Sequence, residues 1–344
     1  MVALRTPLCD LLGIDVPILS AGMGSVAGPE LVTAVSEAGG FGVLGVSGAS
    51  PETVQARIDR CRALTKRPFG VNVIIDEVGW APSADERELV RSEVLKAIEA
   101  RVAAVVLFWG DPAPYVKPAH GNGVKVLVQV GSVGEAETAA AAGVDAVIVQ
   151  GVEAGGHVRG TSSIWELLPA AVAAIAPVPV LASGGIGDGD GIRRAIGLGA
   201  QGVSLGTRFV AAEESLAHAE YKRRLVESVA ADTVYTEDLY DVSWPGAPTR
   251  TLRNRTFSEW DAAGRPPAGR RPGEGTVVGK VQLPSGHVLE LPRYGGAGSP
   301  LAGFEGDLDY VAMWAGESVE VIHDVLPAGG IVRRLAAQAV ATGS

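Results

Sequence analysis

Short apolar segments bounded by glycine and proline recur through the first two-thirds of the chain. Segments that are apolar on both faces are typical of parallel strands covered by helices on each side. The pattern therefore predicts eight buried strands, at residues 17–23, 41–46, 69–75, 103–109, 125–131, 146–150, 179–184 and 202–207.

Helical patterns lie between these segments, and several begin at Pro, Ser, Asp or Glu and end near Gly. The clearest are residues 29–38, 51–63, 84–100, 135–142, 163–176 and 189–197. Eight strand–helix repeats match a closed barrel. The alternative is an open doubly wound sheet, but its glycine fingerprint is missing, because Gly22-Met23-Gly24 after the first strand is too short. The prediction is an α/β fold, a (β/α)8 TIM barrel with an inserted loop or hairpin subdomain near the C-terminus.

The pattern changes after about residue 230, where prolines and turn dipeptides become frequent. Residues 276–283 and 287–291, joined by Pro284-Ser285-Gly286, predict a β-hairpin. We interpret residues 1–232 as the barrel and 233–309 as an insertion or lid. Residues 310–344 are expected to pack back on the barrel, and the last part of the chain is expected to form two helical stretches split near Pro327.

Composition narrows the class of partner. The chain has 344 residues, of which 47% are hydrophobic and 20% charged, and its net charge is -10. An acidic surface argues against nucleic acid and against anionic membranes. No uninterrupted apolar run reaches the roughly 18 residues of a membrane helix, and the N-terminus lacks the pattern of a signal peptide. A cytoplasmic protein is therefore expected.

Glycines and hydroxyl residues end the last two predicted strands: Ser183-Gly184-Gly185 follows the seventh, and Gly206-Thr207 follows the eighth. Barrels commonly bind phosphate at these two positions. Glycine allows backbone N–H groups to approach a phosphate closely. Either site alone could be a simple tight turn, but two on adjacent strands favour a phosphate site.

A second feature follows the sixth strand, where Glu153-Ala154-Gly155-Gly156-His157 combines small residues with a histidine. A lone loop histidine is more often a plain surface residue. Its position beside the predicted phosphate site instead favours His157 as a catalytic acid, base or hydrogen-bond donor. No two histidines have a metal-ligand spacing, so no catalytic metal is expected.

Other polar and aromatic residues fall near the same predicted end of the barrel. Gly22, Met23 and Gly24 could bind the edge of a planar ring, as could Asn72 and Gln129, although Asn72 could equally cap a turn. Arg159 could bind an anion or lie on the surface. Several aromatic residues are candidates for either pocket wall or core: Trp80, Trp109, Tyr310 and Trp314.

Several motifs in combination resemble the nitronate monooxygenase family, formerly called 2-nitropropane dioxygenases. They are PILSAGMG at 17–24, AGGFGVL at 38–44, PFGVN at 68–72, EAGGH at 153–157, ASGGIG at 182–187 and LGAQGVSLGTRF at 198–209. The resemblance runs from about residue 5 to 230 and returns in MWAGESVEVIH at 313–323.

The resemblance implies FMN as the cofactor. It implies that His157 is the catalytic histidine and that Gly155 lines the flavin face. It places the flavin ring and ribityl chain near Gly22, Met23, Gly24, Asn72 and Gln129, and the phosphate at Ser183, Gly184, Gly185, Gly206 and Thr207. The implied reaction is oxidation of an alkyl nitronate, or of a nitroalkane, by O2 to a carbonyl compound and nitrite.

Two alternatives stay open. An NAD(P)H-dependent flavin reductase acting on a quinone or an enoyl thioester shares the E-A-G-G-H segment. A non-catalytic flavin-binding protein could keep the same scaffold. The expected partners are a small-molecule substrate and O2, with neither nucleic acid nor membrane, and a homodimer is left open as the assembly.

Overall fold

A computed structural model describes residues 4–75, 83–242, 244–282, 288–296 and 299–341 of the chain. Eight parallel strands form one sheet in the order β1-β9-β8-β6-β5-β4-β3-β2. All eight coincide with predicted strands: β1 (Ile18–Ser20), β2 (Gly42–Gly45), β3 (Phe69–Ile74), β4 (Ala104–Phe108), β5 (Lys125–Val130), β6 (Ala146–Gln150), β8 (Val180–Ser183) and β9 (Gly202–Leu205).

The two edge strands of this sheet meet and nearly close it into a barrel. Leu19 of β1 forms a parallel bridge with Phe41, just before β2. The Phe41 N–H donates to the Ile18 carbonyl at 3.0 Å, and the Ser20 N–H donates to the Phe41 carbonyl at 3.1 Å. The predicted barrel fold is therefore confirmed.

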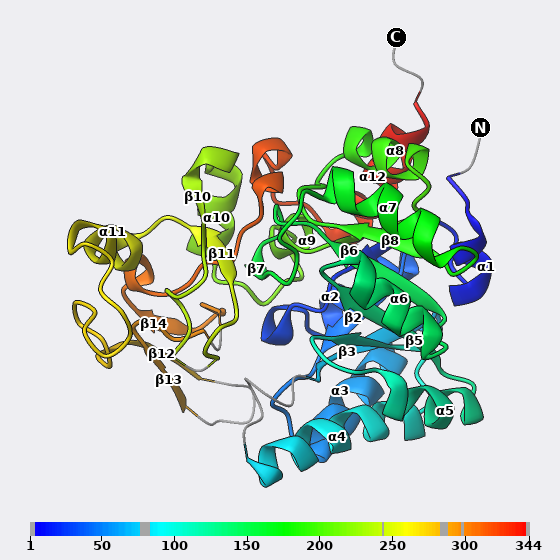
Figure 1. The fold of residues 1–344 in the computed structure, drawn as a ribbon, viewed down its shortest axis with the longest axis horizontal. Coiled ribbons are helices and arrows are strands. Elements are labelled where there is room, and N and C mark those ends of the chain that lie inside the picture. The colour runs from blue at the N-terminus through cyan, green and yellow to red at the C-terminus, as the bar shows by residue number, and fades with distance from the viewer. Residues whose placement is uncertain (1–3, 76–82, 243, 283–287, 297–298, 342–344) are drawn as a thin grey trace.

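Helices cover the outside of the barrel (Figure 1). They are α2 (Pro29–Glu37), α3 (Pro51–Leu64), α4 (Ala84–Glu99), α5 (Ala113–Gly121), α6 (Val133–Ala141), α7 (Ile164–Ile175), α8 (Gly189–Gly197) and α12 (Ala328–Val340). Side-chain caps close the first turns of α3, α4, α6, α7 and α8. Ser83 and Glu86 form a reciprocal capping box at α4, for example, and the Asp188 side chain accepts the Gly191 N–H at α8.

The barrel interior is filled at the end where the strands begin. The end where the strands finish, the carboxyl end, is therefore the one available for a ligand. A short helix that the sequence did not predict, α1 (Pro7–Leu12), places Leu8, Cys9 and Leu12 in one apolar cluster with inward side chains of the barrel strands. These side chains include Phe41 and Leu127, which are fully buried.

Beyond the barrel the chain forms two small antiparallel sheets (Figure 1). One has the order β10-β11-β7 and the other β13-β12-β14. The strands are β7 (Gly156–His157), β10 (Thr233–Thr236), β11 (Thr249–Leu252), β12 (Val277–Gln282), β13 (Val288–Pro292) and β14 (Phe304–Gly306). The predicted hairpin is confirmed in β12 and β13, and its tip, residues 283–287 with Pro284-Ser285-Gly286, lies outside the described residues.

Short helical elements join these strands: α9 (Thr207–Val210), α10 (Ala219–Glu227), α11 (Arg255–Ala262), and 3-10 turns at Gly24–Val26, Ala230–Asp232, Leu308–Tyr310 and Glu317–Val321. The prediction of two helical stretches near the C-terminus is wrong in its first half. Between residues 308 and 326 the chain forms only two 3-10 turns, because residues 313–315 run beside β11 instead, with Thr251 bridged to Trp314. No helix in the described part of the chain has the length and apolarity to cross a membrane.

Close packing of helix α2 on strand β2 makes Gly42 a sensitive position. A Cβ at Gly42 would lie 2.0 Å from the Val32 carbonyl oxygen, which is backbone and cannot rotate away. We expect Gly42→Ala to cost about 1–3 kcal/mol of stability. The matched control is Gly134→Ala in α6, where a Cβ meets nothing within 4 Å and alanine should be neutral or stabilising by up to about 1 kcal/mol. Thermal unfolding of both variants tests this, and equal melting temperatures would contradict it.

Candidate active site

A cavity of about 300 Å³ lies at the carboxyl ends of the barrel strands. The structure brings every predicted site residue to its wall. They are Gly22, Met23, Gly24, Asn72, Gln129, Gly155, His157, Ser183, Gly184, Gly185, Gly206 and Thr207. They come from the ends of six different strands or the loops that follow, which is where active sites of this fold lie.

Glycines form a cradle in this wall because side chains would not fit. Gly184 and Gly185 have φ values of +103° and +68°, which are unfavourable for other residues, and they follow the buried Ser183 directly. A Cβ at Gly22 would lie 2.2 Å from Asn72 Cβ, and one at Gly155 would lie 2.3 Å from the Gly316 nitrogen. Close packing and backbone conformation therefore require glycine at these four positions, all of which line the cavity.

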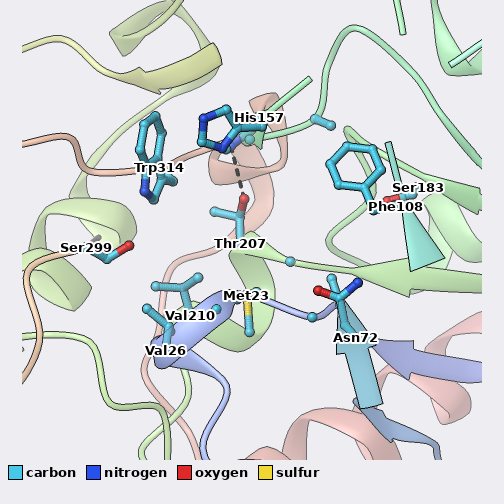
Figure 2. Close-up of a pocket in the computed structure, with 18 of the residues that line it drawn as sticks. Met23, Val26, Asn72, Phe108, His157, Ser183, Thr207, Val210, Ser299 and Trp314 are labelled. Atoms are coloured by element: carbon cyan, nitrogen blue, oxygen red, sulfur yellow. Dashed lines mark hydrogen bonds between the residues drawn. The ribbon is translucent and has the colours of Figure 1, made fainter. Parts of the chain in front are cut away.

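Two polar side chains that line the cavity beside these glycines already form hydrogen bonds within the protein. The Asn72 side chain donates its Nδ2 to the Val106 carbonyl at 2.9 Å, which leaves Oδ1 for a ligand. The Thr207 hydroxyl accepts the Gly316 N–H at 3.0 Å, as Figure 2 shows. A hydroxyl that accepts one bond still has its own proton to donate. Thr207 can therefore serve as a donor toward an anionic group in the cavity.

The backbone around His157 is fixed from two sides. On one side, β7 pairs antiparallel with β11, with His157 opposite Thr249. On the other, the Gln150 side chain at the end of β6 donates to the His157 carbonyl at 3.0 Å and accepts the Arg159 N–H at 2.7 Å. His157 is thus held between the barrel and the strands that follow it.

The His157 ring sits against two indoles. Its centroid lies 4.4 Å from the ring of Trp244 and 5.3 Å from the ring of Trp314, and Figure 2 shows the Trp314 ring beside it. Its Nε2 has no hydrogen-bond partner among the described residues. The residue as a whole is half-buried and lines the cavity, and burial of the imidazole lowers the pKa of His157 to about 4. The imidazole is therefore neutral at physiological pH.

Among the described residues that line the cavity, none is Asp, Glu, Lys or Arg. Arg159 follows His157 closely but is paired elsewhere: its guanidinium contacts Glu135 at 2.6 Å and lies over the Trp109 ring at 5.0 Å. The polar groups of the wall are hydroxyls, amides, backbone groups and the neutral imidazole. Nor does the described part of the chain contain a group of three His, Cys, Asp or Glu side chains placed to hold a metal ion.

Of the remaining aromatic residues that the sequence suggested for the pocket wall, only some line the cavity. Trp314 lines the cavity, whereas Trp109 stands behind it, with its ring 4.9 Å from that of Trp244. Tyr310 packs under Arg293 at 4.7 Å and donates to Glu259. Trp80 lies outside the described residues.

Sequence reasoning missed several wall residues: Tyr221, Trp244, Val281, Leu289 and Leu301. Trp244 begins the turn-rich sequence WPGAP, and nothing local in that sequence indicates that its indole packs on His157. The others are ordinary apolar residues in the later part of the chain.

A barrel that is filled at one end and carries a glycine-lined cavity at the other is the design of enzymes that bind a phosphate-bearing organic cofactor. A family model described as nitronate monooxygenase matches residues 5–338. A nitronate monooxygenase of Pseudomonas aeruginosa is 35% identical over 94% of this chain and 96% of its own length. The chain belongs to the nitronate monooxygenase family, and it is a flavin-dependent oxidoreductase.

Two further similarities bear on activity. A protein of Mycobacterium tuberculosis named (3aS,4S,5R,7aS)-5-hydroxy-7a-methyl-1-oxo-octahydro-1H-indene-4-carboxyl-CoA dehydrogenase is 36% identical over 76% of this chain and 70% of its own length. The crystal structure of a nitroalkane oxidase from Streptomyces ansochromogenes superposes with a TM-score of 0.77 at 30% identity, over 96% of this chain and 97% of that one. Relatives with different named activities therefore share this fold.

The neutral state of His157 can be measured directly. We expect ¹H–¹⁵N spectra of the imidazole, assigned with the His157→Asn variant, to show a neutral ring from pH 8 down to about 5.5, with protonation centred near pH 4. Because the unfolded imidazole takes up a proton at its usual pKa of 6.5, His157 should also cost the native state stability as the pH falls from about 6.5 toward 4. A titration midpoint near 6.5 would contradict the desolvated environment.

Proposed function

We propose that the enzyme uses FMN to oxidise alkyl nitronates with O2, yielding a carbonyl compound and nitrite. The observation that carries the proposal is the position of His157, whose ring packs against two indoles and which lines the same cavity as the glycine cradle. Membership of the nitronate monooxygenase family supports the substrate class. When bound, FMN would supply the electron acceptor for the substrate and the electron donor for oxygen.

The cradle suits FMN in its shape and its donors. Ser183, Gly184 and Gly185 would hold the phosphate from the end of β8, with Gly206 and Thr207 from the end of β9. Gly22, Met23 and Gly24 would contact the flavin ring, and Gly155 would line its face. Asn72 and Gln129 would touch the ring or the ribityl chain. Because no described lining residue is charged, backbone N–H groups and hydroxyls would bind the phosphate.

His157 is better suited to hold a nitronate than to make one. A group with a pKa of about 4 is a weak base at neutral pH, because an efficient general base has a pKa near the working pH. A neutral imidazole can donate a hydrogen bond to a nitronate oxygen in a site from which the indoles exclude water. The bound anion would in turn raise the pKa of His157 and strengthen that bond.

The substrate assignment is tested by comparing preformed nitronates with the parent nitroalkanes. We expect kcat/KM for a nitronate to exceed that for its nitroalkane by about 100-fold or more at pH 7. A nitroalkane must first lose a proton, and a poor base provides little of the roughly 10²–10⁴-fold acceleration that general base catalysis can supply. Nitrite release and oxygen uptake measure turnover, and chromatography of the released flavin should identify FMN. Equal values for the two forms would contradict the role given to His157.

The reductase alternative predicts a different half-reaction. Mixing the purified protein with NADH or NADPH in the absence of oxygen should leave the flavin absorbance unchanged, whereas an anaerobic nitronate should bleach it. Rapid bleaching by either nucleotide, without nitrite release from nitronates, would replace the proposed function by the reductase. Protein that cannot be reconstituted with FMN would instead favour the non-catalytic scaffold.

Substitution of the histidine separates binding from turnover. We expect His157→Asn to keep the flavin spectrum and lose about 100-fold in kcat/KM, because it removes the ring that the indoles position. The matched control is His120→Asn, since His120 is on the surface and pairs with Asp145. A His157→Asn enzyme with unchanged kcat/KM would remove His157 from the mechanism.

A further inference from the structure

The outer part of the cavity wall is aliphatic, unlike the polar cradle. Val26, Val210, Tyr221, Val281 and Leu301 line it, and all five belong to one apolar cluster that lies between the barrel and the later part of the chain. They come from separate elements, so the wall exists only in the folded protein. Figure 2 shows Val26 and Val210 beside Met23 at this part of the cavity.

The β12–β13 hairpin adds an open apolar edge to this wall. Val281 in β12 lies opposite Leu289 in β13, and both line the cavity. The next pair, Gln282 with Val288, points to the other face because side chains alternate along a strand. Leu289 is 37% exposed although it borders a cavity. Leu289 therefore extends the apolar wall from the buried Val281 to the edge of the cavity.

The absence of charge in the described wall restricts what such a ligand carries. A second charged group on the substrate would be buried without an opposite charge, and this is costly. Each methylene group placed against the aliphatic wall is instead favourable. The polar side chains that the described residues contribute to this part are neutral, such as those of Ser25 and Ser299.

We propose that the physiological substrate carries an extended, uncharged alkyl tail, which lies along Val26, Val210, Val281, Leu289 and Leu301 while its reacting end meets His157. This inference rests on the proposed function and deepens it, because it names the tail that the nitronate bears.

The first experiment varies the tail. We expect kcat/KM for linear primary nitronates of three to eight carbons to rise about threefold to fourfold per methylene group, the factor that corresponds to burying one such group. The nitronate of 6-nitrohexanoate should be at least about 100-fold poorer than that of 1-nitrohexane, because its carboxylate would be buried unpaired. Values independent of length, or equal for the two six-carbon substrates, would overturn the proposal.

Two substitutions in strand β13 test whether the dependence of kcat/KM on tail length arises from the β12–β13 hairpin. Leu289→Ala should lower kcat/KM for the eight-carbon nitronate about tenfold, since it removes contacts of roughly two methylene groups. Val288→Ala is the matched control on the opposite face of the same strand, where the side chain is 48% exposed, and it should leave kcat/KM unchanged. Equal losses in the two variants would overturn the assignment of the wall.

Binding without turnover separates this inference from the proposed function. The Kd of neutral primary alcohols, followed by tryptophan fluorescence because Trp244 and Trp314 line the cavity, should fall at least 30-fold from butanol to octanol and weaken in Leu289→Ala. If this occurs but no nitronate is oxidised, the inference of an alkyl-binding wall is supported and the proposed function is contradicted. If nitronates are oxidised but neither kcat/KM for the nitronates nor Kd for the alcohols depends on chain length, the proposed function is supported and the inference of an alkyl-binding wall is contradicted.

Discussion

The antiparallel pairing of β11 with β7 is the constraint on which the site depends. It places Arg250 opposite Gly156 and Thr249 opposite His157. The buried Arg250 guanidinium donates to the Val152 carbonyl at 3.0 and 3.1 Å and contacts Glu317 at 3.1 Å. A single side chain thus ties the loop after β6 to β11 and to the C-terminal segment. Without these contacts the glycine-rich loop would lose the conformation that fixes His157.

The same arrangement sets the electrostatics of the histidine. Its indole neighbours, Trp244 and Trp314, both come from the chain beyond the barrel. They are part of the surroundings that bury the imidazole and lower the pKa of His157. The barrel supplies the backbone cradle, and the later segments supply the desolvated environment. The environment of His157 therefore depends on the barrel loop that carries it and on the later segments together.

This division explains how much could be predicted from the sequence. Buried strands and their terminal glycines are local signals, so the eight strands and the cavity positions such as Asn72 and Gly184 were accessible. The pairing of the two-residue strand β7 with β11 is non-local and has no periodicity to reveal it. Residues 308–326 read as helix because their pairing beside β11 is not encoded nearby. The pKa of His157 likewise depends on contacts with residues about 90 and 160 positions later along the chain.

An uncharged cavity is compatible with an anionic nitronate because the charge needs hydrogen-bond donors only at the reacting end. In the proposed binding mode the His157 imidazole would supply such a donor, and the tail would add no further charge. Because the wall for the tail comes largely from elements beyond the barrel strands, such as β12 and β13, substitutions there can change the substrate without disturbing the cradle. A relative named as a CoA dehydrogenase, 36% identical over 76% of this chain, is consistent with this, since one barrel carries different named activities. The proposed alkyl tail therefore assigns substrate choice to the segments that cover His157, and leaves the glycine cradle to the cofactor.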